Sequence, residues 1–122
     1  MTFVAGTPLS AADLNDALAS DSPTTFSTTT PAGTGWYRFL LGGALVEFYF
    51  LSTGNVSSGT TVTLDFTIPA AYRPADKTAV GAASSTTTKL GACVIDSAGA
   101  ITFYNGHTSS AVAYAHGTYK PA

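Results

Sequence analysis

The chain has 122 residues, 10% of them charged and 45% hydrophobic, with a formal net charge of −2, and this length suits one domain with a short appendage. Its five basic residues are scattered and no apolar run approaches the roughly 20 residues of a membrane-spanning helix, so we expect neither a nucleic-acid partner nor membrane insertion. The shortage of charge predicts that some apolar surface is buried against copies of the chain or a larger particle.

The first predicted element is a short helix from about Ala11 to Ala19, within an attachment arm that spans residues 1–19. Ser10 followed by Asp13 is typical of a helix N-cap with an acidic first turn. So short a helix is marginal alone in water, so it must dock on its own domain, on sister subunits or on a carrier protein. The apolar side chains expected to anchor it are Leu9, Leu14 and Leu18.

Residues 20–35 are rich in Ser, Thr, Pro and Gly, with Phe26 as their single large apolar residue. A stretch of this composition cannot bury a core and predicts an extended linker. The alternative is a loosely packed first strand rich in threonine.

The remaining residues, 36–122, predict an antiparallel β-sandwich or jelly-roll, because short strands alternate with turn residues. Residues 61–68 alternate polar and apolar, as expected for a strand with one buried face. The expected strands are Trp36 to Leu41, Ala44 to Ser52, Thr60 to Ile68, Thr78 to Ser84, Thr88 to Asp96, Ala100 to Tyr104 and Ala111 to Tyr119.

The strand from Ala44 is apolar on both alternating faces, which predicts a cover on both. One cover is the opposite sheet, and a neighbouring subunit is the candidate for the second, which makes Phe48 and Phe50 oligomer-interface candidates. Glu47 interrupts this strand either as an interface partner for Arg38 or Arg73 or as an edge charge that discourages stray pairing.

The segment Ile68-Pro69-Ala70-Ala71-Tyr72-Arg73-Pro74 follows a Gly-Trp-Tyr strand and precedes an Asp-Ser-Ala-Gly hairpin. This arrangement resembles the head or knob domains of phage tail-fibre and baseplate proteins, which often carry a strand followed by a Leu-Pro-x-x-Tyr-Arg-Pro corner. The start of the chain, from Phe3 to Asn15, is similar to the opening of many small phage tail and fibre genes.

At the corner, we expect Tyr72 to pack internally. Arg73 is expected to pair with Glu47 or Asp76, and it is a further candidate for the oligomer interface.

No enzymatic motif is recognisable in the sequence, and we expect no enzyme activity, no metal site and no cofactor. Cys93 is the single cysteine and is expected to be buried and inert. His107 and His116 lack the spacing of a metal motif, although histidines of three copies can converge on a trimer axis. Glu47 and Asp65 are the one carboxylate pair that could face each other on adjacent strands.

Binding is the better case for a ligand, because aromatic rings accept the C–H faces of sugars while amides and imidazoles hold hydroxyl groups. The candidate ligand-binding residues are Tyr104, Asn105, His107, Tyr114 and His116. The resemblance implies a structural virion component made in the host cytoplasm, a homotrimeric tail-fibre or tail-tip protein. Its arm would bind other virion proteins, and its β domain would be free to bind a host-surface saccharide. The alternative is a capsid decoration, cement or collar protein without a ligand.

Overall fold

The computed structural model describes residues 10–84 and 89–122. This part contains one short helix, two 3₁₀ turns and eight strands, and every strand pair is antiparallel. The predicted all-β class with a short N-terminal helix is confirmed. The elements are α1 (Ala11–Leu18), β1 (Thr24–Thr29), β2 (Ala32–Leu40), η1 (Leu41–Gly43), β3 (Leu45–Val56), β4 (Thr61–Thr67), η2 (Ala70–Tyr72), β5 (Thr78–Ser84), β6 (Lys89–Ile95), β7 (Ala100–Asn105) and β8 (Ala111–Tyr119).

The strands form one sheet in the order β1-β2-β3-β8-β5-β6-β7-β4, folded into two layers. The bend lies at β5, which pairs with β8 of the first layer and with β6 of the second. The end strands β1 and β4 meet through side chains, since the backbone N–H of Thr29 donates to both carboxylate oxygens of Asp65 at 2.9 and 3.1 Å. The sheet is therefore nearly closed, with its end strands β1 and β4 in contact at Thr29 and Asp65.

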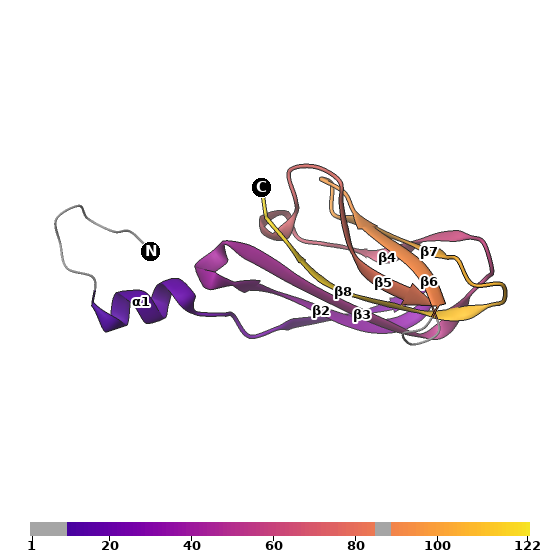
Figure 1. Ribbon diagram of the computed structural model, residues 1–122, viewed down its shortest axis with the longest axis horizontal. Coiled ribbons are helices and arrows are strands. Elements are labelled where there is room, and N and C mark those ends of the chain that lie inside the picture. Colours follow the sequence, from indigo (N-terminus) through magenta and orange to yellow (C-terminus); the bar gives the residue numbers. More distant parts are fainter. Residues whose placement is uncertain (1–9, 85–88) are drawn as a thin grey trace.

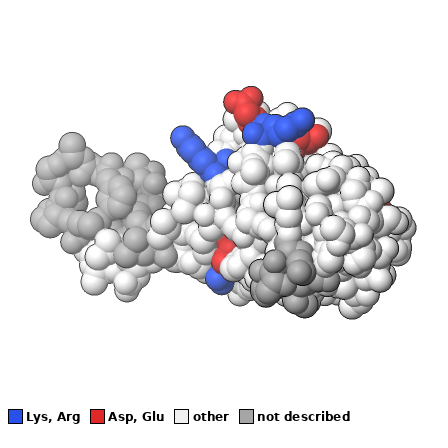
Figure 2. Space-filling view, turned by 45° about the vertical axis from the view of Figure 1, so that its right-hand side comes forward, with Lys and Arg blue, Asp and Glu red and all other residues white. Residues whose placement is uncertain are grey.

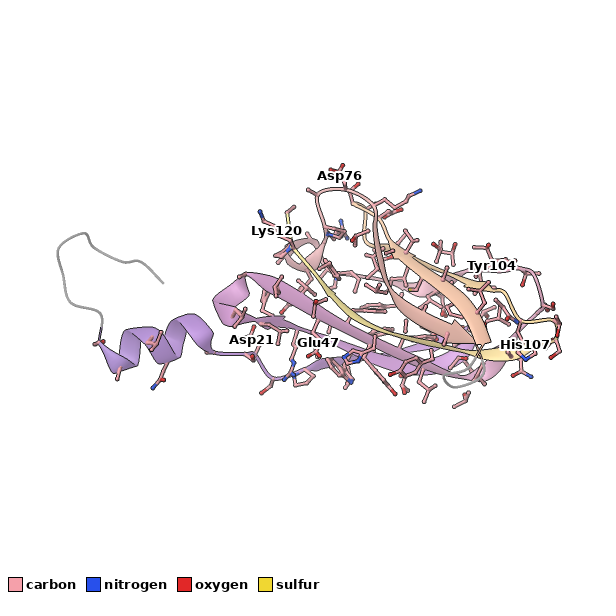
Figure 3. The ribbon with its side chains drawn as sticks, viewed as in Figure 1. Asp21, Glu47, Asp76, Tyr104, His107 and Lys120 are labelled. Atoms are coloured by element: carbon pink, nitrogen blue, oxygen red, sulfur yellow. The ribbon has the colours of Figure 1, made fainter. Side chains whose placement is uncertain are left out.

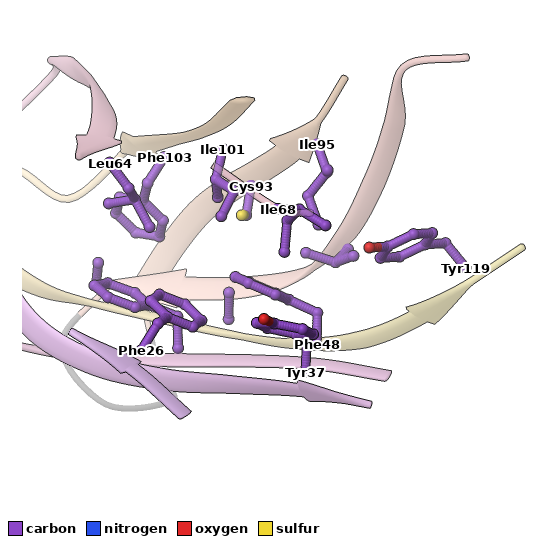
Figure 4. Packing of buried hydrophobic residues seen from close by; sticks show 14 of the residues in the cluster. Phe26, Tyr37, Phe48, Leu64, Ile68, Cys93, Ile95, Ile101, Phe103 and Tyr119 are labelled. Carbon is purple, nitrogen blue, oxygen red and sulfur yellow. The ribbon is translucent and has the colours of Figure 1, made fainter. Parts of the chain in front are cut away.

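The core lies between the two layers (Figure 4). Cys93 is buried there, as predicted, and burial raises the pKa of its thiol to about 12. The most buried large side chains come from both layers and include Phe48, Phe50, Ile68, Ile95, Ile101 and Phe103.

The two faces of strand β3 differ in burial. Val46, Phe48 and Phe50 are at most 1% exposed and belong to the core. The expectation that Phe48 and Phe50 form an oligomer interface is therefore wrong, because the second layer of the same chain covers them. The opposite face of β3, which carries Glu47 and Tyr49, points outward and is half-buried.

The linker predicted over residues 20–35 is also wrong from Thr24 onward, where β1 and then β2 begin. The alternative of a threonine-rich first strand is confirmed, and β-branched threonine suits a strand. Phe26 is 7% exposed, and its ring lies 4.1 Å from that of Phe66 and 5.9 Å from that of Phe48, centroid to centroid. One apolar side chain thus joins β1 to both layers.

Helix α1 extends from one end of the sandwich and contacts η1 (Figure 1). The N–H of Gly42 donates to the carbonyl of Ala19 at 2.9 Å, and the N–H of Asp21 donates to that of Phe39 at 3.1 Å. Leu14 and Leu41 remain 46% and 45% exposed at this end of the molecule. Of the other two expected anchoring residues, Leu9 and the side chain of Leu18 lie outside the described part of the chain.

The Ile-Pro-Ala-Ala-Tyr-Arg-Pro segment forms a corner built around the 3₁₀ turn η2. Tyr72 packs as predicted, since its ring stacks on Phe39 at a centroid distance of 4.2 Å and meets Tyr37 edge-on at 4.8 Å. The hydroxyl of Tyr119 donates to the carbonyl of Tyr72 at 2.6 Å, and burial raises the pKa of that hydroxyl. The corner is thereby fixed to β2 and to the end of β8.

Arg73 does not form the predicted ion pair with Glu47 or Asp76. Its Nε donates instead to the carbonyl of Ile68 at 2.7 Å, which closes the corner on itself. The half-buried side chain thus serves the corner of its own subunit. The guanidinium thus supplies a hydrogen-bond donor to a carbonyl at the point where the chain leaves the sheet.

Gly99 lets the Asp-Ser-Ala-Gly hairpin lie against this corner. The N–H of Ile68 donates to the carbonyl of Gly99 at 2.9 Å, and the φ of Gly99 is 85°. A Cβ atom at Gly99 would lie 2.5 Å from the carbonyl oxygen of Ile68 and 2.7 Å from Nε of Arg73. The strand, corner and hairpin of the resemblance therefore meet as one packed unit.

Gly99→Ala should destabilise the fold by both strain and overpacking. Gly59→Ala is the matched control, because Gly59 also has a positive φ, of 66°, and nothing lies within 4 Å of the place that its Cβ atom would take. We expect the control to cost about 1 to 2 kcal/mol and Gly99→Ala to cost a further 1 to 3 kcal/mol, roughly, measured by urea unfolding. Equal losses in the two variants would show that the corner does not constrain Gly99.

Candidate functional site

Three neighbouring strands of the first layer carry large polar and aromatic side chains on their outer side. Because the register pairs Trp36 with Tyr49, Arg38 with Glu47, and Tyr49 with His116, alternation brings these side chains to one surface. We call this surface the aromatic face, and it comprises Trp36 and Arg38 of β2, Glu47 and Tyr49 of β3, and Tyr114 and His116 of β8.

The rings of the aromatic face contact one another. Trp36 stacks on Tyr49 at a centroid distance of 5.5 Å, and Tyr49 meets Tyr114 and His116 edge-on, each at 5.9 Å. The guanidinium carbon of Arg38 lies 5.5 Å from the Trp36 centroid, within the range of a cation–π contact. The four rings and the guanidinium thus form one continuous cluster across three strands.

Glu47 lies at the centre of a charged network within this cluster. Nε of Arg38 donates to its Oε1 at 2.7 Å, and Nε2 of His116 lies 2.9 Å from its Oε2. Nε2 carries the proton in this contact, because a carboxylate only accepts. Partial burial opposes ionisation of Glu47, but the hydrogen bonds from His116 and Arg38 outweigh it and lower its pKa below the ordinary value of 4.5.

Glu47 pairs with Arg38, one of the two partners expected from the sequence, but the pair forms within the chain and not across an interface. The Glu47 side chain is only 15% exposed. Glu47 and Asp65, which the sequence allowed to face each other, do not do so, because β3 and β4 are not neighbours in the sheet. Asp65 instead accepts hydrogen bonds from Thr29, and the bond from the threonine hydroxyl is the main cause of its lowered pKa.

The predicted ligand-binding residues fall into two groups. Tyr114 and His116 belong to the aromatic face, whereas Tyr104 lies on β7 of the other layer and is 38% exposed. Figure 3 places Tyr104 and His107 toward the end of the sandwich away from α1, and Glu47 nearer to the helix. The five residues therefore do not form one binding site.

Asn105 holds a loop together and does not face solvent. It is fully buried, and its amide donates to the carbonyl of Val56 at 2.8 Å and to that of Ser109 at 3.1 Å, while its oxygen accepts from the N–H of His107 at 2.8 Å. The imidazole of His107 accepts from the N–H of Ser109 at 3.2 Å within the same loop. Both side chains thus form hydrogen bonds that stabilise this loop.

A shallow open hollow of about 380 Å³ lies at the corner and the C-terminus, well away from the aromatic face. Its polar lining comes from Asp76, Lys77, Thr78 and Lys120, and Figure 3 labels Asp76 and Lys120 on this side. Among residues 10–84 and 89–122, no three His, Cys, Asp or Glu residues gather as a metal site. The one helix of this part falls far short of the length that crosses a membrane.

Sequence reasoning did not recognise Trp36, Arg38, Glu47 and Tyr49 as site residues. Part of the signal was present, because Glu47 and Tyr49 alternate with the buried Phe48 and Phe50 and must share a face. The missing information was the strand order, since β8 lies beside β3 although some 60 residues separate them in the chain. Comparison with protein-family models and with curated proteins gave no match.

Glu47→Gln should lower stability in a pH-dependent way. The pKa of Glu47 in the folded chain lies below 4.5, so its charge stabilises the fold above that pH, and the contribution disappears as the pH falls through the folded pKa. We expect the variant to be less stable at pH 7 by at most about 1 kcal/mol and to equal the wild type in strong acid. The measurement is the midpoint of urea unfolding between pH 2 and pH 7.

The matched control is Asp76→Asn, which removes one exposed carboxylate outside the network. A constant difference between Glu47→Gln and the wild type at every pH would contradict the network as described.

Proposed function

We propose that the chain is a structural, non-enzymatic subunit of a bacteriophage virion, a tail-fibre or tail-tip protein that is attached at its N-terminal end. The observation that carries the proposal is the packed unit made by β2, the corner and the Gly99 hairpin. These are the three segments in which the sequence resembles tail-fibre heads. Contacts of Tyr37 with Tyr72, and of Gly99 with the corner, pack the three segments together.

The end of the molecule that carries α1 suits attachment. The helix lies beyond the sandwich (Figure 1), and the exposed leucines Leu14 and Leu41 lie on elements that contact each other. Leu41 also has a φ of 53°, a strained conformation for a residue with a side chain. Two exposed leucines on contacting elements are a docking surface of the kind that another virion protein would cover.

Two companion proposals receive less support. Saccharide binding by the five predicted residues needs them in one place, and they lie in two. A decoration or collar role on the capsid uses the same attachment end, and no contact within the described residues favours it over a tail position.

The proposal is tested by locating the protein on phage particles. An epitope tag after Ala122, which is exposed, should place immunogold label at the tail tip or fibres of intact virions. The labelled particles must also yield peptides of this chain by mass spectrometry after purification on a density gradient.

Label on the capsid would overturn the tail position and establish the decoration alternative. Virions that carry neither label nor peptides would overturn the virion proposal itself, provided that the tagged protein is detected in the infected cells.

A further inference from the structure

The outward surfaces of the two layers carry different large side chains. Strands β4, β6 and β7 present small side chains, among them Thr61, Thr63, Ala92 and Thr102, together with two exposed large ones, Leu90 at 69% and Tyr104 at 38%. The first layer instead presents the aromatic face of Trp36, Tyr49 and Tyr114. The face of the molecule that Figure 2 shows is mostly uncharged as well.

Small side chains border the aromatic face on both sides. The register places Gly81 opposite His116 and Ala83 opposite Tyr114 on β5, and it places Thr25 opposite Trp36 on β1. Since directly paired residues share a face, these positions lie on the same outer surface. The surface is therefore a central aromatic ridge with a low shelf along each side.

We propose that this surface is where copies of the chain assemble, with the aromatic ridge of one copy packed on the small-residue shelf of another. The occupant is thus a second copy of this chain. The inference deepens the proposed function, because a fibre or tail-tip subunit is expected to be a homotrimer, but it depends only on the chemistry of this surface.

Internal ring contacts favour a protein partner over a sugar. A pyranose stacks on a free aromatic face, but Trp36 is already in contact with Tyr49 and Arg38, each at 5.5 Å. Tyr49 in turn meets three other rings. The cluster is therefore a ridge of rings that already contact one another, and such a ridge packs well against small aliphatic side chains.

Charge balance allows this surface to lose its water. The positive charge of Arg38 and the negative charge of Glu47 neutralise each other at 2.7 Å, and His116 donates to the same carboxylate. Burying a charge is costly unless it is paired and hydrogen-bonded, and here the pairing exists before association. Trp, Tyr and Arg are also the residues that are enriched at interfaces.

Assembly through strand edges, the usual alternative for a β-sheet protein, is hindered where the two end strands meet. The two end strands, β1 and β4, are engaged with each other through Asp65, Thr29 and the Phe26–Phe66 stack. The outer face of a layer is the other surface through which copies of the chain can associate. With β2 nine residues long, five strands cover roughly 24 by 30 Å, close to the about 800 Å² per partner of a standard interface.

Light scattering on the full chain tests the proposal across a wide concentration range. We expect an oligomer, near three times 12.4 kDa for a trimer. Tyr49→Arg places a charge in the ridge and should weaken self-association at least 100-fold, roughly the loss of a well-buried interface anchor. The matched control is Tyr104→Arg, which makes the same change on the other layer and should leave the native mass unchanged.

A second variant, Ala83→Arg, alters the shelf beside Tyr114, leaves every residue of the ridge itself unchanged, and should dissociate the oligomer in the same way. Circular dichroism and thermal unfolding establish that each variant is folded. A wild type that stays monomeric at the highest concentration, or an oligomer that survives both Tyr49→Arg and Ala83→Arg, would overturn the proposal.

These outcomes are separate from those of the virion test. A protein that is monomeric but found on virions would contradict the self-association proposal and leave the virion proposal intact. An oligomer that is absent from virions would contradict the virion proposal and leave the self-association proposal intact.

Discussion

The burial of one face of β3 is the constraint on which the rest of the structure depends. Val46, Phe48 and Phe50 fill the space between the layers, and a shift of register by a single residue would move all three to the outside. Replacing any one of these large side chains by alanine would cost several kcal/mol, about 3 to 5 for a phenylalanine. The core thus fixes the position of the neighbouring strands as well as its own.

The outer surface follows from that register. Once Phe48 points inward, Glu47 and Tyr49 must point outward, and the antiparallel pairing with β2 and β8 brings Arg38, Trp36 and His116 beside them. The aromatic face therefore needs no scaffold of its own. A surface built on three central strands is also more rigid than one built on loops, which suits a permanent contact between subunits.

Short-range patterns in the sequence predicted the secondary-structure elements well. Contacts between residues far apart in the chain could not be predicted from these patterns. The alternation of residues 61–68 and the turn at Gly99 correctly indicated β4 and the hairpin after β6. Phe26 was misjudged because a single apolar residue in a polar stretch carries no periodicity, although in space it stacks on Phe66 of the other layer. Arg73 was misjudged because its partner is a backbone carbonyl, which no side-chain pattern reveals.

Association that buries the aromatic face would change the surroundings of Trp36, which is the single tryptophan of the chain and therefore reports on this surface directly. The measurement is quenching of Trp36 fluorescence by acrylamide, compared between the wild type and Ala83→Arg at the same high concentration. We predict a quenching constant several-fold lower in the wild type, with the two converging on dilution. Equal quenching of an oligomeric wild type and a monomeric variant would contradict burial of this face.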